Sequence, residues 1–385
     1  MLCVVAFFAL AGGALLAPVL PEMVGPLHTT TQNVALLMSV FTISTAFFTL
    51  IIGHFTDRVN RKRILVPCLL IYGLTGLVGF FITDFPLLLI VRFLQGIGVA
   101  GMTTLAMLVI GDVYTGLDRV AAMSRISITF ALGSVFAPII GGGLALFGWN
   151  YAFLFYALSL PFAVLVILFL PETRVPAETM HHNGMIGALR CLRDLPILAT
   201  VFMGFSIFFL LFAMMIYVPF MLKESFGYAS GASGVMLAVP GITCILMAPL
   251  VKPLTGKYSL PLVIAAGFIG VGLPMLFLAG VQSVATVVLL LLVFGAGLIF
   301  AQTAIDVQLI QLSPLATRGG VISIHSCMKY IGQSAAPIVL GIILVIFGLN
   351  TVFIVAGILG VLIALMTYLM KNRFAGVLAV QPAAP

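Results

Sequence analysis

Charged residues are scarce in this chain. Asp, Glu, Lys and Arg make up 7% of the 385 residues, whereas hydrophobic residues make up 63%. A soluble globular domain carries about 25% charged residues, so the composition excludes a soluble protein and indicates a chain that crosses a membrane many times. The formal net charge of +7 comes from basic residues in short segments between apolar runs. That distribution is typical of membrane topology and not of nucleic-acid binding.

Metal-binding and catalytic signatures are also lacking. The five cysteines are scattered and form no CxxC pair, which argues against zinc sites and disulfides. The pair His181-His182 has no third ligand close to it in the sequence, so we do not expect a metal there. No HExxH, GxSxG or Asp-rich metal motif occurs. We therefore expect a protein that is not an enzyme and that needs no cofactor.

Twelve apolar runs are long enough to cross a bilayer, which takes about 20 helical residues. They predict an all-α polytopic membrane protein with helices at residues 2–24, 33–55, 64–83, 86–110, 120–147, 150–170, 196–221, 230–251, 260–280, 284–308, 318–347 and 350–370. The first run lacks a basic n-region and a small-residue cleavage site. We interpret it as a membrane helix and not as a cleaved signal peptide.

Basic residues lie almost entirely on one side of this helix order. If the amino terminus is cytoplasmic, all Lys and Arg residues except Arg92, Lys223 and Lys329 fall in cytoplasmic segments. Arg92 and Lys329 fall inside predicted helices, and Lys223 falls in a predicted outer loop. By the positive-inside rule, this bias predicts a multi-pass protein of a prokaryotic cytoplasmic (inner) membrane with both termini in the cytoplasm.

The two halves of the sequence repeat. Gly and Pro open and close both segment 133–138 and segment 332–337, and Arg119 recurs as Arg318 at the same offset. Such a repeat predicts two parallel six-helix halves related by an axis along the membrane normal. The expected domains are an N-terminal bundle at 1–171, a cytoplasmic linker at 172–195, a C-terminal bundle at 196–371 and a cytoplasmic tail at 372–385.

Three short motifs carry a family resemblance. The segment 53–63 reads Gly-x-x-x-Asp-Arg-x-x-Arg-Lys-Arg, with Asn60 where Gly is usual. The segment 92–96 reads Arg-x-x-x-Gly, and 133–142 contains Ala-Pro-x-x-Gly-Gly, with Ala137 where the related motif has Gly. These motifs resemble those of the major facilitator superfamily, and the third resembles that of its 12-helix drug–proton antiporters. The resemblance implies the major facilitator fold, with 12 transmembrane helices in two six-helix pseudo-repeats.

Charged residues at the predicted cytoplasmic ends resemble the gate of that family. We expect them to form a charge cluster that closes in one rigid-body arrangement and opens in the other. The predicted cytoplasmic gate comprises Gly53, Asp57, Arg58, Arg61, Asp112 and Arg119. The equivalent loop of the second half keeps Lys252 and Lys257 but has no Asp, so the gate is expected to be asymmetric.

Three ionisable residues are candidates for proton coupling: Glu22, Arg92 and Asp306. A charge inside a span must face a cavity or a partner. Two alternatives stay open, namely that Arg92 extends to the outer surface and that Glu22 is merely solvated at the interface.

The antiporter-like motif comprises Gly133, Ala137, Pro138, Gly141 and Gly142. Pro138 removes a backbone hydrogen bond and is expected to kink the fifth helix. Gly141, Gly142 and Gly143 are expected to let another helix approach closely. Ordinary small-residue packing is the alternative.

A polar face is predicted on the eleventh helix, where His325, Lys329 and Gln333 follow one another at intervals of four residues. Lys329 is expected near mid-membrane, paired with Asp306 or attracting an anionic substrate; a purely structural ion pair is the alternative. The resemblance implies a substrate cavity between the halves. Its candidate residues are Met102, Thr103, Phe205, Phe208, Phe209, Phe212, Gln302, His325, Lys329 and Gln333.

These features favour a secondary active transporter that works by alternating access. We expect a monomer that exports drugs or other amphipathic small molecules, with the proton gradient as its energy source. One alternative is a transporter of a defined anionic metabolite that uses Lys329 and Arg92. Another is a membrane sensor that transports nothing, although no signalling domain is visible in the sequence.

Overall fold

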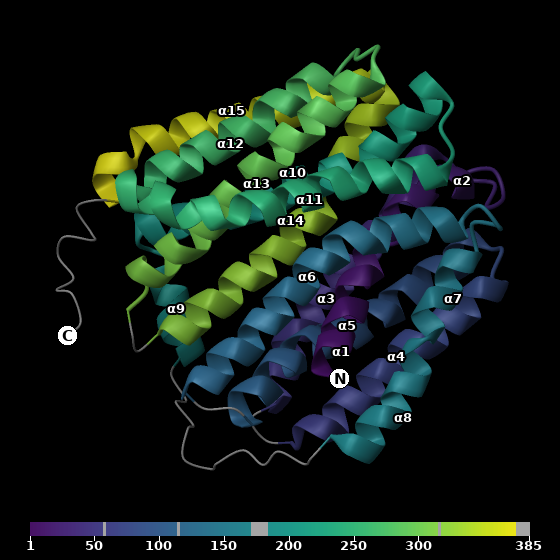
Figure 1. Ribbon diagram of the computed structural model, residues 1–385, viewed down its shortest axis with the longest axis horizontal. Helices are drawn as coiled ribbons and strands as arrows, with labels where there is room; N and C mark the ends of the chain where they lie inside the picture. The colour runs from purple at the N-terminus through teal and green to yellow at the C-terminus, as the bar shows by residue number, and fades with distance from the viewer. Residues whose placement is uncertain (57–58, 114–115, 171–183, 315–316, 375–385) are drawn as a thin grey trace. The chain divides into compact units, whose positions relative to one another are not determined.

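The computed structural model describes residues 1–56, 59–113, 116–170, 184–314 and 317–374. The helices in these ranges are α1 (Leu2–Ala14), α2 (Leu20–Met23), α3 (Thr31–Thr56), α4 (Arg61–Phe81), α5 (Phe85–Val113), α6 (Gly116–Leu144), α7 (Tyr151–Ala157), α8 (Ser159–Phe169), α9 (Gly184–Cys191), α10 (Leu195–Phe226), α11 (Ser230–Lys257), α12 (Leu260–Leu278), α13 (Val284–Leu312), α14 (Arg318–Phe347) and α15 (Leu349–Leu369) (Figure 1). A 3₁₀ turn, Ala17–Val19, separates α1 from α2.

Eleven segments of the described chain are long and apolar enough to cross a membrane. The shorter apolar stretch Ile128–Leu144 of α6 lies where the fifth span was predicted. The described residues contain no strand. The predicted all-α polytopic fold is therefore confirmed.

Two predicted spans are interrupted. The first changes from α-helix to a 3₁₀ turn at Ala17–Val19, with Pro18 in that turn and Pro21 at the start of α2. Proline has no backbone N–H and is tolerated best in a first helical turn, which explains the break. The sixth predicted span is divided into α7 and α8 at Leu158.

The basic segment before the third span is partly helical. Asn60 precedes α4, and its Oδ1 accepts a hydrogen bond from the Lys62 backbone N–H at 3.2 Å, as an N-cap does. Arg61, Lys62 and Arg63 therefore form the first turn of α4, whereas the sequence predicts a loop there. Lys223, predicted in a loop, lies in the last turns of α10. The predicted linker contains the helix α9.

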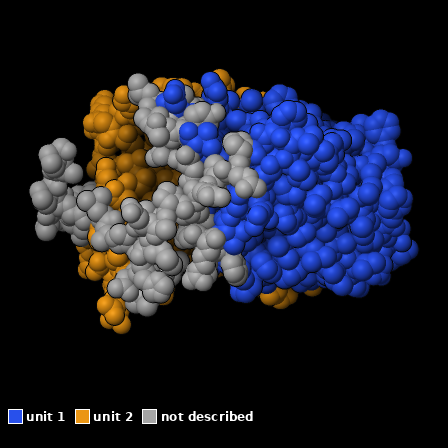
Figure 2. All heavy atoms as spheres, turned by 90° about the horizontal axis from the view of Figure 1, so that it is seen from below, with its two compact units in different colours: residues 1–180, 215–241, 337–341 blue, residues 181–214, 242–336, 342–385 orange. Residues whose placement is uncertain are grey.

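The chain forms two compact units (Figure 2). Unit 1 contains residues 1–180, 215–241 and 337–341, and unit 2 contains the remaining residues. In unit 1, α5 packs against α3 and α4, and α1 packs against α6. In unit 2, α12 packs against α13 and α15, and Figure 1 shows α12 beside α15. Unit 1 thus includes residues from the predicted second bundle, at the end of α10 and the start of α11.

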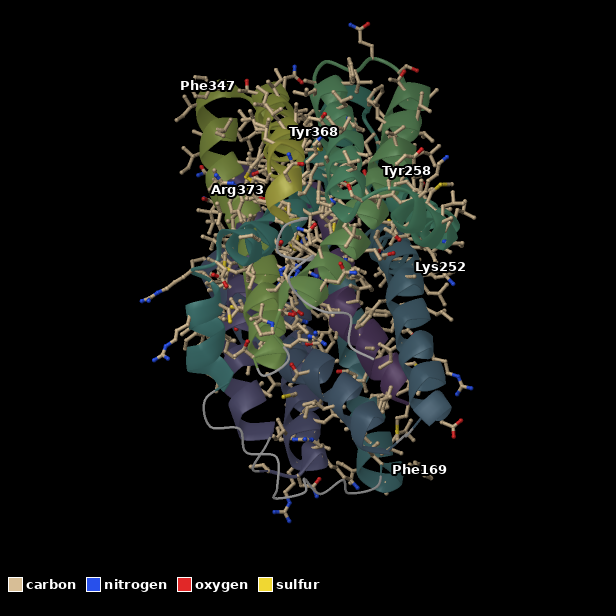
Figure 3. All side chains as sticks on the ribbon, turned by 90° about the vertical axis from the view of Figure 1, so that its left-hand side faces the viewer. Phe169, Lys252, Tyr258, Phe347, Tyr368 and Arg373 are labelled. Carbon is tan, nitrogen blue, oxygen red and sulfur yellow. The ribbon has the colours of Figure 1, made fainter. Side chains whose placement is uncertain are left out.

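Large apolar side chains cover the outside of the helices. Phe169 is 70% exposed and Phe347 is 67% exposed, and both lie at helix ends in Figure 3. Near the carboxyl end of α15, the Lys371 ammonium lies 4.2 Å from the centroid of the Tyr368 ring. Aromatic rings beside basic groups are typical of membrane–water interfaces, and exposed apolar surface of this kind fits contact with lipid.

Candidate coupling and binding sites

Unit 2 contains a cluster of three ionisable side chains within its membrane helices. Lys329 Nζ on α14 donates to Asp306 Oδ1 on α13 at 2.6 Å. His325 Nε2, one turn before Lys329 on the same face of α14, lies 3.1 Å from the same oxygen. The predicted pairing of Lys329 with Asp306 is confirmed.

The three side chains differ in exposure. Asp306 is 41% exposed, whereas Lys329 is 17% and His325 is 3% exposed. The ammonium also lies 5.4 Å from the centroid of the Phe208 ring on α10. Removing an ion pair from water is costly, and the cost is repaid only when the geometry is good and further hydrogen bonds satisfy the charges. Asp306 is thus the most accessible side chain of the cluster.

A glycine on α10 makes room for the imidazole. A Cβ placed on Gly204 would overlap the His325 ring. Farther along α14, Gly332 lies against the Phe205 carbonyl, so a Cβ there would also overlap α10. His325 Nδ1 is buried without a hydrogen-bond partner among the described residues. The ring therefore lies against α10 at Cε1 and contacts the Asp306 carboxylate through Nε2.

An aromatic row follows the same helix. The rings of Phe202, Phe205 and Phe209 stack in succession, with centroids 5.9 Å and then 6.1 Å apart. Phe205 and Phe208 are partly exposed, while Phe209 and Phe212 are buried. Phe208 lies outside this stack and faces the Lys329 ammonium. Phe205 and Phe208 therefore offer partly exposed apolar, polarisable surface on α10.

The other predicted cavity residues are distributed between the two units. Gln302 on α13 is partly exposed, and Gln333 on α14 is buried. Met102 and Thr103 belong to unit 1; Met102 is fully buried, and Thr103 Oγ1 donates to the Val99 carbonyl of its own helix at 3.0 Å. The cavity that would join these residues stays a prediction.

Arg92 is fully buried inside unit 1. Its guanidinium donates to Gln95 Oε1 at 2.6 Å, to the Gly12 carbonyl at 3.0 Å and to the Leu37 carbonyl at 3.3 Å. It also lies 4.2 Å from the centroid of the Phe41 ring. The interpretation that Arg92 extends to the outer surface is therefore wrong. In the described part of the chain, no carboxylate forms an ion pair with it.

Glu22 has a partner that the sequence did not predict. Lys223 Nζ lies 3.0 Å from Glu22 Oε2 and donates to the Pro21 carbonyl at 2.9 Å. All three residues belong to unit 1, and the two charged side chains are 34% and 42% exposed. Glu22 is therefore paired with Lys223 while its side chain stays partly exposed, so its role in proton coupling stays a prediction.

The glycines of the antiporter-like motif are contact points of α6. A Cβ on Gly141 would overlap the Leu15 carbonyl, and one on Gly142 would overlap the Ser230 carbonyl at the start of α11. Close approach is thus confirmed at these two positions. The same expectation for Gly143 is wrong, because nothing lies within 4 Å of its Cβ position.

Neighbouring positions of the motif are packed as well. Gly133 faces the Leu10 side chain, and Ala137 is fully buried. Pro138 lies inside α6, and its carbonyl would meet a Cβ on Gly234 of α11. The motif is therefore a packing surface within unit 1.

Comparison with protein families shows to which superfamily this chain belongs. The Major Facilitator Superfamily model matches residues 2–337 and 222–379. This chain belongs to the major facilitator superfamily.

Two curated relatives in this superfamily come from Bacillus subtilis (strain 168). The bacillibactin exporter is 29% identical over 85% of this chain and 84% of its own length. Multidrug efflux protein YfmO is 26% identical over 98% of this chain and 93% of its own length. This protein is therefore a membrane transporter of the superfamily.

Solved structures share the fold. A bacterial homologue of the human lysosomal transporter Spinster, inward-facing and occupied, superposes with a TM-score of 0.83 at 16% identity, covering 99% of this chain and 97% of that chain. The nucleoside transporter NupG gives a TM-score of 0.82 at 16% identity, covering 96% and 98%. The predicted major facilitator fold is confirmed.

The superfamily-like cytoplasmic gate falls largely outside the described residues. Asp57 and Arg58 are not among them, and the side chains of Gly53, Asp112 and Arg119 are not described either. Arg61, at the first position of α4, is buried. The gate stays a prediction.

Two further positions were not identified from the sequence. Gly204 carries no motif, and its contact with His325 joins helices that are far apart along the chain. The sequence predicts Lys223 in an outer loop and gives no signal for its pairing with Glu22.

Proposed function

We propose that this protein is a secondary active transporter that exports amphipathic small molecules in exchange for protons. The cytoplasmic membrane of a prokaryote, with both termini inside, is the setting that fits the distribution of basic residues. Relatives named as an exporter and as a multidrug efflux protein support the direction of transport and the breadth of the substrate class.

The observation that carries the proposal is the accessible carboxylate of Asp306 within an apolar span. An ionisable group in such a span is most simply explained by function, because an uncompensated charge there is costly. Asp306 has the Lys329 ammonium and the His325 imidazole within 3.1 Å. A carboxylate with two exchangeable partners can take up a proton at one membrane face and release it at the other.

The other two candidates for proton coupling fit less well. Arg92 is a poor proton carrier, because an arginine guanidinium is not deprotonated in proteins. Its N–H groups also already donate to three acceptors. Glu22 lies in the short helix α2 and is paired with Lys223 of α10. Asp306 is therefore the residue to which we assign proton exchange.

A defined anionic metabolite is the second candidate substrate, and the Lys329 ammonium favours it. An anion would have to displace Asp306 from Lys329, whose side chain is only 17% exposed. The occupied donors of Arg92 argue against a second cationic ligand from that residue. The exposed carboxylate and the aromatic row of α10 fit an amphipathic cation better.

The proposal is tested in inverted membrane vesicles that carry an imposed pH gradient and a pH-sensitive dye. Addition of ethidium should dissipate the gradient in vesicles containing the protein and not in vesicles lacking it. Asp306→Asn should abolish this response. The matched control is Asp84→Asn, because Asp84 is exposed and caps α5 through the Leu87 N–H, and Asn caps equally well. Dissipation by organic anions and not by ethidium would favour the second candidate.

A further inference from the structure

We propose that Lys329 is a tethered competitor at Asp306. In this scheme the carboxylate binds one cation at a time: the Lys329 ammonium, a proton, or the cationic group of a transported organic cation. The inference rests on the proposed function and adds to it the charge of the cargo and the role of the lysine.

The two oxygens of the Asp306 carboxylate differ in their partners. His325 and Lys329 both approach Oδ1, and Oδ2 accepts no hydrogen bond from the described residues. With Asp306 41% exposed and the ammonium 17% exposed, an incoming group meets the carboxylate before it meets the lysine. A cation can therefore bind at Oδ2 while Lys329 still occupies Oδ1, and then displace it.

Few charged groups surround the Asp306–Lys329 pair. On α14, His325 and Lys329 are the charged or titratable groups that face Asp306. The part of α10 in unit 2, residues 195–214, has no ionisable side chain, and α12 has none either. On α11, Lys252 and Lys257 are exposed, and Cys244 donates to the Gly295 carbonyl. The closed Asp306–Lys329 pair is thus neutral when His325 is neutral.

A displaced Lys329 side chain has a second partner nearby. Its ammonium lies 5.4 Å from the Phe208 centroid, and an aromatic face attracts a cation. Lys329 can therefore leave the carboxylate without losing every favourable contact. When the cargo departs, the ammonium returns, so the empty transporter does not carry a bare carboxylate in an apolar span.

This arrangement also bears on anionic cargo. An acidic group would be repelled by the exposed carboxylate and would find the ammonium shielded by Phe208 and by the ion pair. The geometry points to monovalent organic cations that carry an apolar or aromatic body, which would rest on the partly exposed Phe205 and Phe208.

The test needs no transport. Dicyclohexylcarbodiimide modifies protonated carboxyl groups in apolar surroundings, and mass spectrometry reports the modified fraction of Asp306 in the purified full-length protein. Lys329→Met should speed labelling by about tenfold or more, because the loss of an opposite charge favours the protonated carboxyl. Lys329→Arg keeps the charge and should label at the wild-type rate. Lys371→Met, which removes the ammonium over Tyr368, is the matched control and should also label at that rate.

A second arm measures binding of tetraphenylphosphonium to the same proteins in detergent. Without the tethered competitor, Lys329→Met should bind the cation more tightly and release more protons for each cation bound. Equal labelling of wild type and Lys329→Met would overturn the proposal, as would Lys329→Arg labelling as fast as Lys329→Met. Weaker binding of the cation by Lys329→Met would overturn it too. Failure of the proposed function is distinguishable, because it appears as wild-type vesicles without ethidium-driven proton movement.

Discussion

Replacing Gly204 with Ala tests the geometry of the charged cluster directly. The new Cβ would overlap His325 Cε1, and it would lie 2.7 Å from Nδ1 and 3.0 Å from Nε2. Relieving this overlap moves either α10 or the ring, and a ring that moves disturbs its 3.1 Å hydrogen bond with Asp306. Either α10 shifts or the imidazole leaves the carboxylate.

The stability that Gly204→Ala would lose can be estimated for each of these two outcomes. Overpacking a tight contact costs about 1–3 kcal/mol, and a hydrogen bond to a charged group contributes about 1.5–3 kcal/mol. We expect Gly204→Ala to lower the free energy of unfolding by about 1–3 kcal/mol, since the two outcomes are alternatives. In a His325→Ala background the ring is absent, so Gly204→Ala should be neutral or stabilise by up to about 1 kcal/mol.

The assay is a double-mutant cycle. Each variant is unfolded with denaturant in mixed micelles, and the loss of helix is monitored by circular dichroism. Gly256→Ala is the control, because nothing lies within 4 Å of that Cβ position on α11; it should leave stability unchanged or raise it slightly. Additive effects of Gly204→Ala and His325→Ala would refute the contact that we describe between α10 and α14.

Three further predictions concern unit 1. Gly141→Ala should lower the free energy of unfolding by about 1–3 kcal/mol, since its Cβ would overlap backbone, whereas Gly143→Ala should be neutral or stabilising; similar losses at both positions would contradict the packing of α6. Glu22→Gln should cost less than about 1 kcal/mol in thermal unfolding, because its ion pair with Lys223 is solvent-exposed; a loss several times larger would show a stronger link. Arg92→Lys should cost about 1–3 kcal/mol, because an ammonium cannot reach all three acceptors; wild-type stability would show that the network contributes little.

Much of the fold follows from the apolar runs. A bilayer span requires about 20 predominantly apolar residues, so the spans could be placed from hydropathy alone, including the two that the structure divides. The pairing of Lys329 with Asp306 could be predicted for a related reason. Few charges occur in the apolar runs of the second half, and opposite charges in such surroundings are expected to meet.

Other features could not be predicted, because they depend on contacts between distant segments. Arg92 is satisfied mainly by the backbone carbonyls of Gly12 and Leu37, and no side-chain pattern reveals a backbone acceptor. Gly204 is an ordinary small residue until α14 places His325 beside it. The break after α1 has a signal in Pro18 and Pro21, although the hydropathy of residues 2–24 predicts one continuous helix there.

The central claim is that protons and organic cations exchange at Asp306. It is tested most directly in proteoliposomes of the purified protein, loaded with ethidium and with a trapped pH-sensitive dye. Outward movement of ethidium should acidify the lumen in wild-type liposomes and leave it unchanged with Asp306→Asn. A wild-type lumen whose pH does not change as ethidium leaves, or equal acidification with the variant, would contradict the claim.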